Sequence, residues 1–257
     1  MTSGFHPNEL IILAARPAMG KTAFGLNLAV NAAISTKKSV AIFNMEMNAE
    51  QLAMRMIASA GGIELNKLRT GRLEHNDWRK VNEAMSELGD THLYIEDSSG
   101  MTVSEIRAKC RRLATKEPGL AMVVIDYLQL IQGGAKYEGN RQQEVSEISR
   151  SLKTMAMELK IPVIALAQLS RSVELRENKR PIMSDLRESG SIEQDADIVA
   201  FLYRDDYYNK SAAEQSNVSV TELILGKHRN GSTGTIELLF ERDMSNFRNY
   251  IKKNEEK

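Results

Sequence analysis

Residue types that could do chemistry occur first in a loop near the start of the chain, which reads Ala15-Arg16-Pro17-Ala18-Met19-Gly20-Lys21-Thr22. The pattern is that of a phosphate-binding loop, Gly-x-x-x-x-Gly-Lys-Thr, with alanine in place of the first glycine. In such a loop the backbone N–H groups, together with the free N–H groups of a following helix, point at one phosphate. Lys21 would add a cation that reaches the outer phosphates, and the Thr22 hydroxyl could ligate Mg²⁺. The loop therefore predicts a nucleotide site.

Ala15 is a departure from the general pattern. If this position required a positive φ angle, alanine would cost about 1 kcal/mol or more there. We therefore expect Ala15 at negative φ, with Gly20 in the left-handed conformation. An apolar run at residues 10–14 precedes the loop, and an amphipathic helical pattern follows it. This strand–loop–helix context favours a nucleotide site over a chance occurrence of Gly-Lys-Thr.

Glu46, Asp126 and Gln168 each follow an apolar run that predicts a buried strand. In open α/β sheets, ligands bind beyond the carboxyl ends of the strands, so these side chains should lie near the loop. Asp126 could hold the Mg²⁺ shell through water, and Glu46 could orient and deprotonate the water that attacks a γ-phosphate. Gln168 could sense that phosphate. The alternative for each is an ordinary polar residue at a strand end.

Two basic residues, Lys227 and Arg229, alternate along a predicted hairpin and so share one face. One interpretation is a solvated surface. The other is an arginine finger delivered to the nucleotide of a neighbouring subunit, an effect worth ~10³–10⁵ in rate where it operates.

The stretch 169–197 is polar and lacks a clear period, which is unusual for a connection inside a compact domain. Arg187 and the backbone N–H groups near Gly190 could hold a phosphate of a polynucleotide. An exposed charged loop is the alternative interpretation.

The elements that must position these residues alternate between strand and helix. The pattern predicts an α/β fold with a mostly parallel central sheet flanked by helices and a C-terminal antiparallel hairpin around Asn230-Gly231. One predicted helix carries four apolar side chains on one face, namely Trp78, Val81, Met85 and Leu88. The strands are expected at residues 10–14, 39–43, 93–95, 122–125, 163–167, 198–203, 221–225 and 235–240.

Composition limits the classes of function. The chain has 257 residues, 34 Lys+Arg and 34 Asp+Glu, so it lacks the basic excess of a non-specific nucleic-acid binder. We interpret residues 1–257 as a single domain with a frayed charged tail at 252–257. The one cysteine, Cys110, excludes an internal disulfide and is consistent with a reducing compartment such as the cytoplasm. No apolar run approaches the ~18 residues of a membrane span.

Motifs along the chain carry a family resemblance; they are residues 14–17 with 19–22, 43–47, 124–130, 167–171, 184–197 and 227–231. On these motifs the chain resembles the C-terminal, RecA-like motor domain of the DnaB-family replicative DNA helicases, over essentially its whole length. An alanine commonly opens the phosphate loop in that family, so the resemblance accommodates Ala15.

The resemblance implies a RecA-like P-loop NTPase that uses ATP and Mg²⁺. It implies nucleotide binding by Ala15, Arg16, Pro17, Ala18, Met19, Gly20, Lys21, Thr22, Arg55 and Asp126, with Thr22 and Asp126 holding Mg²⁺ partly through water. It implies that Glu46 is the catalytic base and Gln168 the sensor, with Lys21 on the phosphates and Lys227 and Arg229 acting in trans. It implies DNA contacts by Arg187, Glu188 and Gly190.

The same resemblance implies a homohexameric ring that moves 5′ to 3′ on single-stranded DNA and unwinds duplex DNA at the replication fork, within a primosome. The implied partners include a helicase loader, and primase through an N-terminal domain. By this resemblance, we expect that domain and its linker helix to be absent from this chain. Two other interpretations remain: a recombinase or regulatory ATPase of the same superfamily, and a module that binds nucleotide and a loader without unwinding DNA.

Overall fold

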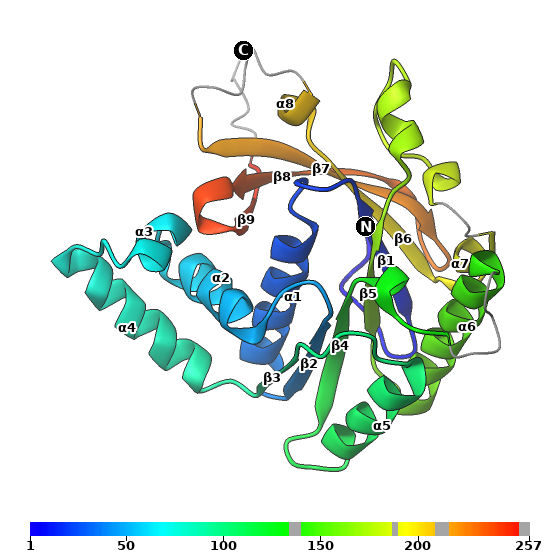
Figure 1. Ribbon diagram of the computed structural model, residues 1–257, viewed down its shortest axis with the longest axis horizontal. Helices are drawn as coiled ribbons and strands as arrows, with labels where there is room; N and C mark the ends of the chain where they lie inside the picture. Colours follow the sequence, from blue (N-terminus) through cyan, green and yellow to red (C-terminus); the bar gives the residue numbers. More distant parts are fainter. Residues whose placement is uncertain (134–139, 187–189, 209–215, 252–257) are drawn as a thin grey trace.

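The computed structural model describes residues 1–133, 140–186, 190–208 and 216–251, in which one sheet runs through the molecule with helices on both faces (Figure 1). The strands are β1 (Leu10–Ala15), β2 (Ser39–Asn44), β3 (Leu93–Glu96), β4 (Leu120–Asp126), β5 (Val163–Gln168), β6 (Ile198–Tyr203), β7 (Val218–His228), β8 (Gly234–Glu241) and β9 (Asn246–Asn249). The α-helices are α1 (Lys21–Thr36), α2 (Ala49–Gly61), α3 (Leu65–Thr70), α4 (His75–Gly89), α5 (Val103–Ala114), α6 (Arg141–Leu159), α7 (Gly190–Asp195) and α8 (Asp205–Tyr208). Short 3₁₀ turns are η1 (Leu128–Leu130), η3 (Arg171–Leu175), η4 (Met183–Asp185) and η6 (Arg242–Met244).

The strand order is β3-β2-β4-β5-β1-β6-β7-β8-β9. Neighbouring strands are parallel from β3 to β6 and antiparallel from β6 to β9. The predicted parallel sheet with a C-terminal antiparallel hairpin is therefore confirmed. The structure adds one strand that the sequence did not predict, β9, which pairs with β8. This strand has four residues, most of them polar, so the sequence shows no apolar run there.

Two hydrophobic cores lie on opposite faces of the sheet because successive strand residues point to opposite sides. In β1, Leu10 and Ile12 pack in the core beneath α5, α6 and α7, whereas Ile11 and Leu13 pack beneath α1 and α2. Cys110 of α5 is fully buried in the first core, and this burial raises the pKa of its thiol to about 12. A structural role for Cys110 follows, since the reactive thiolate form is strongly disfavoured.

Residues 169–197 hold more structure than their polar sequence indicated. The turns η3 and η4 and helix α7 lie in this stretch. A forked ion pair joins Arg176 to Asp185, with both N–O distances at 2.8–2.9 Å. Asp185 is 3% exposed and its carbonyl oxygen accepts a hydrogen bond from the Ser170 N–H. Buried polar contacts of this kind hold the stretch in place. It therefore lacks the regular spacing of apolar residues from which a helix or strand could be predicted.

Only part of the apolar face predicted for helix α4 is buried. Val81 is buried, but Trp78 and Met85 are 53% and 55% exposed. The helix packs on α2 rather than on the sheet, so only a narrow stripe of its surface is covered. Within the described residues, none of the helices has the length and apolar character needed to cross a membrane.

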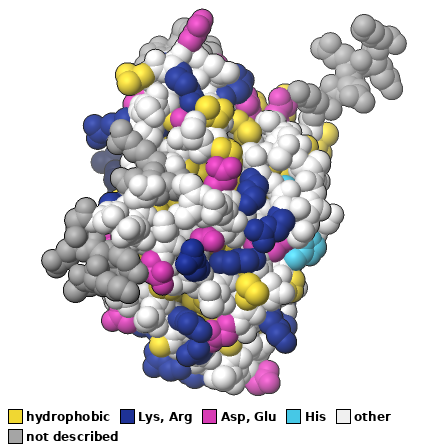
Figure 2. Space-filling model, turned by 90° about the vertical axis from the view of Figure 1, so that its right-hand side faces the viewer, with side chains coloured by type: hydrophobic (Ala, Val, Ile, Leu, Met, Phe, Trp, Pro, Cys, Tyr) yellow, Lys and Arg dark blue, Asp and Glu magenta, His cyan; other side chains and the backbone are white. Residues whose placement is uncertain are grey.

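Charges of both signs are mixed on the face that carries α6 and α7 in Figure 1. Figure 2 shows Lys and Arg side chains there alternating with Asp and Glu rather than forming a single basic field. This agrees with the zero net charge, and it means that a contact between this face and a polyanion would be local.

Candidate nucleotide site

The phosphate loop joins the end of β1 to the start of α1. Ala15 belongs to β1 and pairs with Gln168 on one side and Leu202 on the other, so it is extended as expected. Gly20 has φ +95°, and a Cβ there would lie 2.9 Å from the Phe247 ring. The prediction that Gly20 carries the left-handed conformation is confirmed. Ala18 also has positive φ, +65°, which the sequence did not indicate and which costs an alanine about 1 kcal/mol.

Lys21, Thr22 and Asp126 come together beneath the loop. The Thr22 hydroxyl donates to Asp126 Oδ2 at 2.6 Å, and Lys21 Nζ lies 3.1 Å from Asp126 Oδ1. Asn44 Nδ2 donates to the same Oδ2 at 3.3 Å, from the end of the neighbouring strand. Asp126 is 2% exposed. The end of β4 therefore meets the start of α1 through a buried carboxylate.

These atoms fit Mg²⁺. Asp126 Oδ1 is buried and, among the described residues, accepts no hydrogen bond, although the Lys21 ammonium stands beside it. A hydroxyl and a carboxylate are the hard oxygen ligands that Mg²⁺ takes, with water and phosphate oxygens completing the shell. The described residues hold no cluster of three or more His, Cys, Asp or Glu that could bind a metal on their own. The arrangement suits an ion that arrives with a nucleotide.

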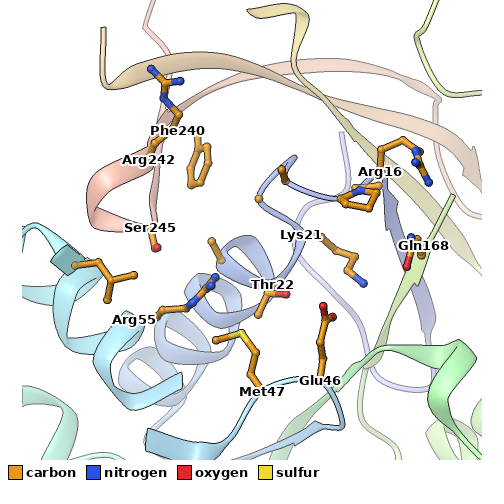
Figure 3. Close-up of a pocket in the computed structure, with 16 residues that line it drawn as sticks. Arg16, Lys21, Thr22, Glu46, Met47, Arg55, Gln168, Phe240, Arg242 and Ser245 are labelled. Atoms are coloured by element: carbon orange, nitrogen blue, oxygen red, sulfur yellow. The ribbon is translucent and has the colours of Figure 1, made fainter. Parts of the chain in front are cut away.

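Glu46 stands across the cavity from Lys21, and Figure 3 shows the two side chains pointing toward one another. The turn after β2 is fixed by Asn44, whose Oδ1 accepts from the N–H groups of Glu46 and Met47 at 2.9 and 2.7 Å. Gln168, at the end of β5, is held by Gln129, which exchanges two hydrogen bonds with its backbone at 3.1 and 3.2 Å. Both predicted side chains thus lie at the cavity on anchored backbone.

The cavity has a volume of about 390 Å³. Its walls include all the predicted loop residues except Met19, whose side chain is buried in the core. Arg55 of α2 also lines the cavity; burial lowers the pKa of Arg55, while Asp126 and Glu46 oppose that shift. Sequence reasoning missed the far wall, which is Met47, Leu65, Phe240, Arg242 and Ser245. Figure 3 labels all of these except Leu65.

Tyr127 is a second omission. Lys21 Nζ lies 4.4 Å from the centre of its ring, within the range of a cation–π contact. Burial raises the pKa of Tyr127, with smaller contributions from Glu46 and Asp126, so the ring remains a neutral phenol. Its position directly after Asp126 is the only sequence signal that could have identified it.

Lys227 and Arg229 lie elsewhere. Neither lines the cavity of the described chain. Lys227 Nζ donates to the carbonyl oxygens of Glu193 and Gln194, at the end of α7. Arg229 donates to Gln194 O at 3.1 Å and pairs with Asp197 at 3.3 Å. Burial, and then the charge of Arg229, lower the pKa of Lys227.

The predicted DNA-contacting residues are only partly described. Gly190 begins α7, and Ser191 next to it meets Ser146 of α6 through a 2.7 Å hydroxyl contact. Arg187 and Glu188 lie outside the described residues.

Comparisons with known proteins point to one family. Residues 1–249 match the family model described as the DnaB-like helicase C terminal domain. The chain is 60% identical over 249 residues to "Replicative DNA helicase DnaC" of Bacillus subtilis (strain 168), and 59% identical to "Replicative DNA helicase DnaB" of Geobacillus stearothermophilus. Each match covers 97% of this chain but 54% of the relative, so the chain spans about half the length of these relatives.

Solved structures agree. One of them, described as an ATPase domain, superposes with a TM-score of 0.90 at 44% identity, covering 96% of this chain and 87% of that one. A DnaB-like replicative helicase, whose structure was described together with its interactions with primase, gives a TM-score of 0.90 at 44% identity over 96% of this chain and 59% of that one.

Proposed function

Since the chain belongs to the family of DnaB-like helicase C-terminal domains, we propose that it is the ATP-hydrolysing motor of a replicative helicase. In this proposal it moves 5′ to 3′ on single-stranded DNA and unwinds duplex DNA at the replication fork. The observation that carries the proposal is the convergence of Lys21, Thr22, Glu46 and Asp126 at the carboxyl ends of β1, β2 and β4. That set combines a loop that can bind phosphate, a hydroxyl and a carboxylate that can ligate a hard cation such as Mg²⁺, and a second carboxylate, that of Glu46, beside the cavity.

Each residue would act on ATP as follows. The loop N–H groups and Lys21 bind the phosphates, and Thr22 and Asp126 hold Mg²⁺, which supplies neutralising charge on the phosphate oxygens when bound. Glu46 orients the attacking water and accepts its proton. Gln168 contacts the γ-phosphate, so the segment that follows β5 responds to whether that phosphate is present. Arg16 links the phosphate loop to this segment directly, because it donates to Leu169 O at 2.9 Å and pairs with Glu174 of η3 at 2.9 Å.

The site would be completed by a second copy. Lys227 and Arg229 are cations of this chain that its own described cavity does not use. A ring of six copies would place them at the nucleotide of a neighbour, where they would stabilise charge that develops on the transferred phosphoryl group. Arg187, Glu188 and Gly190 would contact the backbone of the DNA strand inside that ring.

The remaining partners follow from the same proposal. A loader protein would open or assemble the ring on DNA in the cytoplasm. Primase would be reached through the N-terminal domain that the family resemblance implies, in keeping with the structural neighbour that was described together with its interactions with primase.

A forked-DNA assay tests the proposal. Wild-type chain at high concentration, with ATP and Mg²⁺, should release the labelled strand, and Glu46→Gln at equal concentration should not. ATP hydrolysis that DNA stimulates without strand release would favour the binding-module interpretation. Strand exchange in place of strand release would favour a recombinase.

A further inference from the structure

Arg204 is a buried arginine that no part of the proposed mechanism uses. It follows directly after β6 and is 4% exposed. Its Nη1 donates to the carbonyl oxygen of Ala18, in the middle of the phosphate loop, at 3.1 Å. Arg204 does not line the nucleotide cavity of the described chain, so it reaches the loop from behind.

The guanidinium of Arg204 is held on several sides. Asp206 accepts from Nε at 3.2 Å and from Nη2 at 2.8 Å, a forked pair. Ser219 of β7 accepts from Nη2 at 3.0 Å and donates to the same carboxylate at 2.6 Å. The centre of the Phe240 ring lies 5.4 Å from the guanidinium carbon. Because Asp206 balances its charge and holds its guanidinium in place, Arg204 acts on the loop as a hydrogen-bond donor of fixed orientation and not as an unpaired cation.

The bond ends on a residue whose backbone needs support. The Met19 N–H donates to Arg16 O at 3.4 Å, which closes a turn with Pro17 and Ala18 at its two central positions. Ala18 occupies the second of these with φ +65°. Proline suits the first central position of a type II turn, but the second favours glycine because φ is positive there. A strained residue persists only when its surroundings hold it.

We infer that Arg204 is a positioning residue for the phosphate loop: it holds the Ala18 peptide in the left-handed turn and so pre-forms the cradle. This inference rests on the proposed function, because it assumes that the cradle binds nucleotide phosphates. Asp206, Ser219 and Phe240 fix the arginine, and Phe240 also lies 3.2 Å from the site a Gly20 Cβ would occupy. The same cluster thus lies beside both left-handed residues of the loop.

ADP affinity, measured by titration calorimetry with Mg²⁺, tests the inference. Arg204→Met should weaken ADP binding about 10-fold or more, the loss expected when a charged hydrogen bond that shapes a site is removed. The matched control is Arg180→Met, which breaks a similar fork to Glu222 at 2.7 and 2.9 Å, far more exposed and without a contact to the loop in the described chain. Arg180→Met should bind ADP as the wild type does.

Ala18→Gly completes a double-mutant cycle. Glycine adopts positive φ without strain, so the loop should need Arg204 less. The loss caused by Arg204→Met should therefore be smaller in the Ala18→Gly background than in the wild-type background. A purely structural role of Arg204 would give equal losses in both backgrounds, and that result would overturn the inference.

Circular dichroism and thermal melting should accompany each titration. If Arg204→Met does not fold, Arg204→Lys replaces it, because one ammonium cannot keep both the Asp206 fork and the bond to Ala18. Binding by the folded variant equal to wild type would overturn the inference. A wild-type chain that binds no ADP would instead contradict the proposed function, so the two failures are distinguishable.

Discussion

The phosphate-loop end of the sheet and the β7–β8 turn use their cations in opposite ways. At the first, Lys21 and Arg55 face a cavity of their own chain, beside Glu46. At the second, Lys227 and Arg229 turn to backbone carbonyls at the end of α7 and to Asp197. The first pair of cations lines a cavity of its own chain, and the second pair does not line that cavity in the described residues. We propose that one copy of the chain is enough to bind the nucleotide, whereas fast ATP hydrolysis needs two neighbouring copies.

Arg229→Ala tests this difference with the largest expected effect. ATP turnover should fall by ~10³–10⁵, because a charge that stabilises the transition state is lost, while ADP affinity stays unchanged. The fold should survive, since Asp197 keeps its 2.6 Å ion pair with Lys153. Steady-state ATPase assays and ADP titration would measure the two quantities.

The control for that variant is Arg79→Ala, which removes an exposed arginine paired with Glu83 on α4. It should hydrolyse ATP at the wild-type rate. If Arg229→Ala also kept a rate near wild type, the cations of the β7–β8 turn would be a solvated surface.

Glu46→Gln should have the next largest effect. Loss of the base should lower kcat about 10²–10⁴-fold, and ADP should bind normally because the amide keeps the shape of the side chain. Glu50→Gln, an exposed neighbour on α2, is the matched control. An equal loss of affinity and rate would instead assign Glu46 to ground-state binding.

The smallest effect concerns acid stability near the loop. Burial by itself would raise the pKa of Asp206, but hydrogen bonds from Arg204 and Ser219 outweigh it and hold that pKa below its usual range. A lowered folded-state pKa contributes stability above the unfolded value of about 3.9, and this contribution is lost as pH falls through the folded-state pKa. As the pH falls from 5 to 2, the wild type should therefore lose more unfolding free energy than Asp206→Asn, because only the wild type loses this contribution.

Urea titrations at several pH values would measure this difference. Parallel loss in both proteins would show that Asp206 does not carry an ion pair to Arg204, and would weaken the support assigned to the phosphate loop.

Much of the fold could be predicted because buried parallel strands are apolar along their whole length. Runs such as residues 122–125 and 163–167 mark β4 and β5 almost to their ends. The exposure of Trp78 and Met85 could not be predicted, because helical spacing shows that a face is apolar but not what covers it. The turns between β5 and β6 were missed because polar fork pairs, such as Arg176 with Asp185, hold them.

The residues of the candidate site also fall into those that the sequence could predict and those that it could not. Lys21, Glu46, Asp126 and Gln168 lie at or just beyond the carboxyl ends of strands, where the geometry of an open α/β sheet predicts a ligand. Phe240, Arg242 and Ser245 of the far wall come from β8 and the turn that follows it, in the antiparallel part of the sheet, which that rule does not cover. Arg204 was missed because an arginine after a strand resembles a surface residue in the sequence, and only tertiary packing buries it.

The most direct measurement mixes two inactive variants, Glu46→Gln and Arg229→Ala, and follows ATP hydrolysis. The first has an intact Arg229, and the second has an intact nucleotide site, so random assembly into rings would place them correctly at roughly a quarter of the interfaces. We predict hydrolysis well above the sum of the two separate rates. A mixture that stays at that sum, while light scattering shows that the copies assemble together, would contradict a site completed by its neighbour.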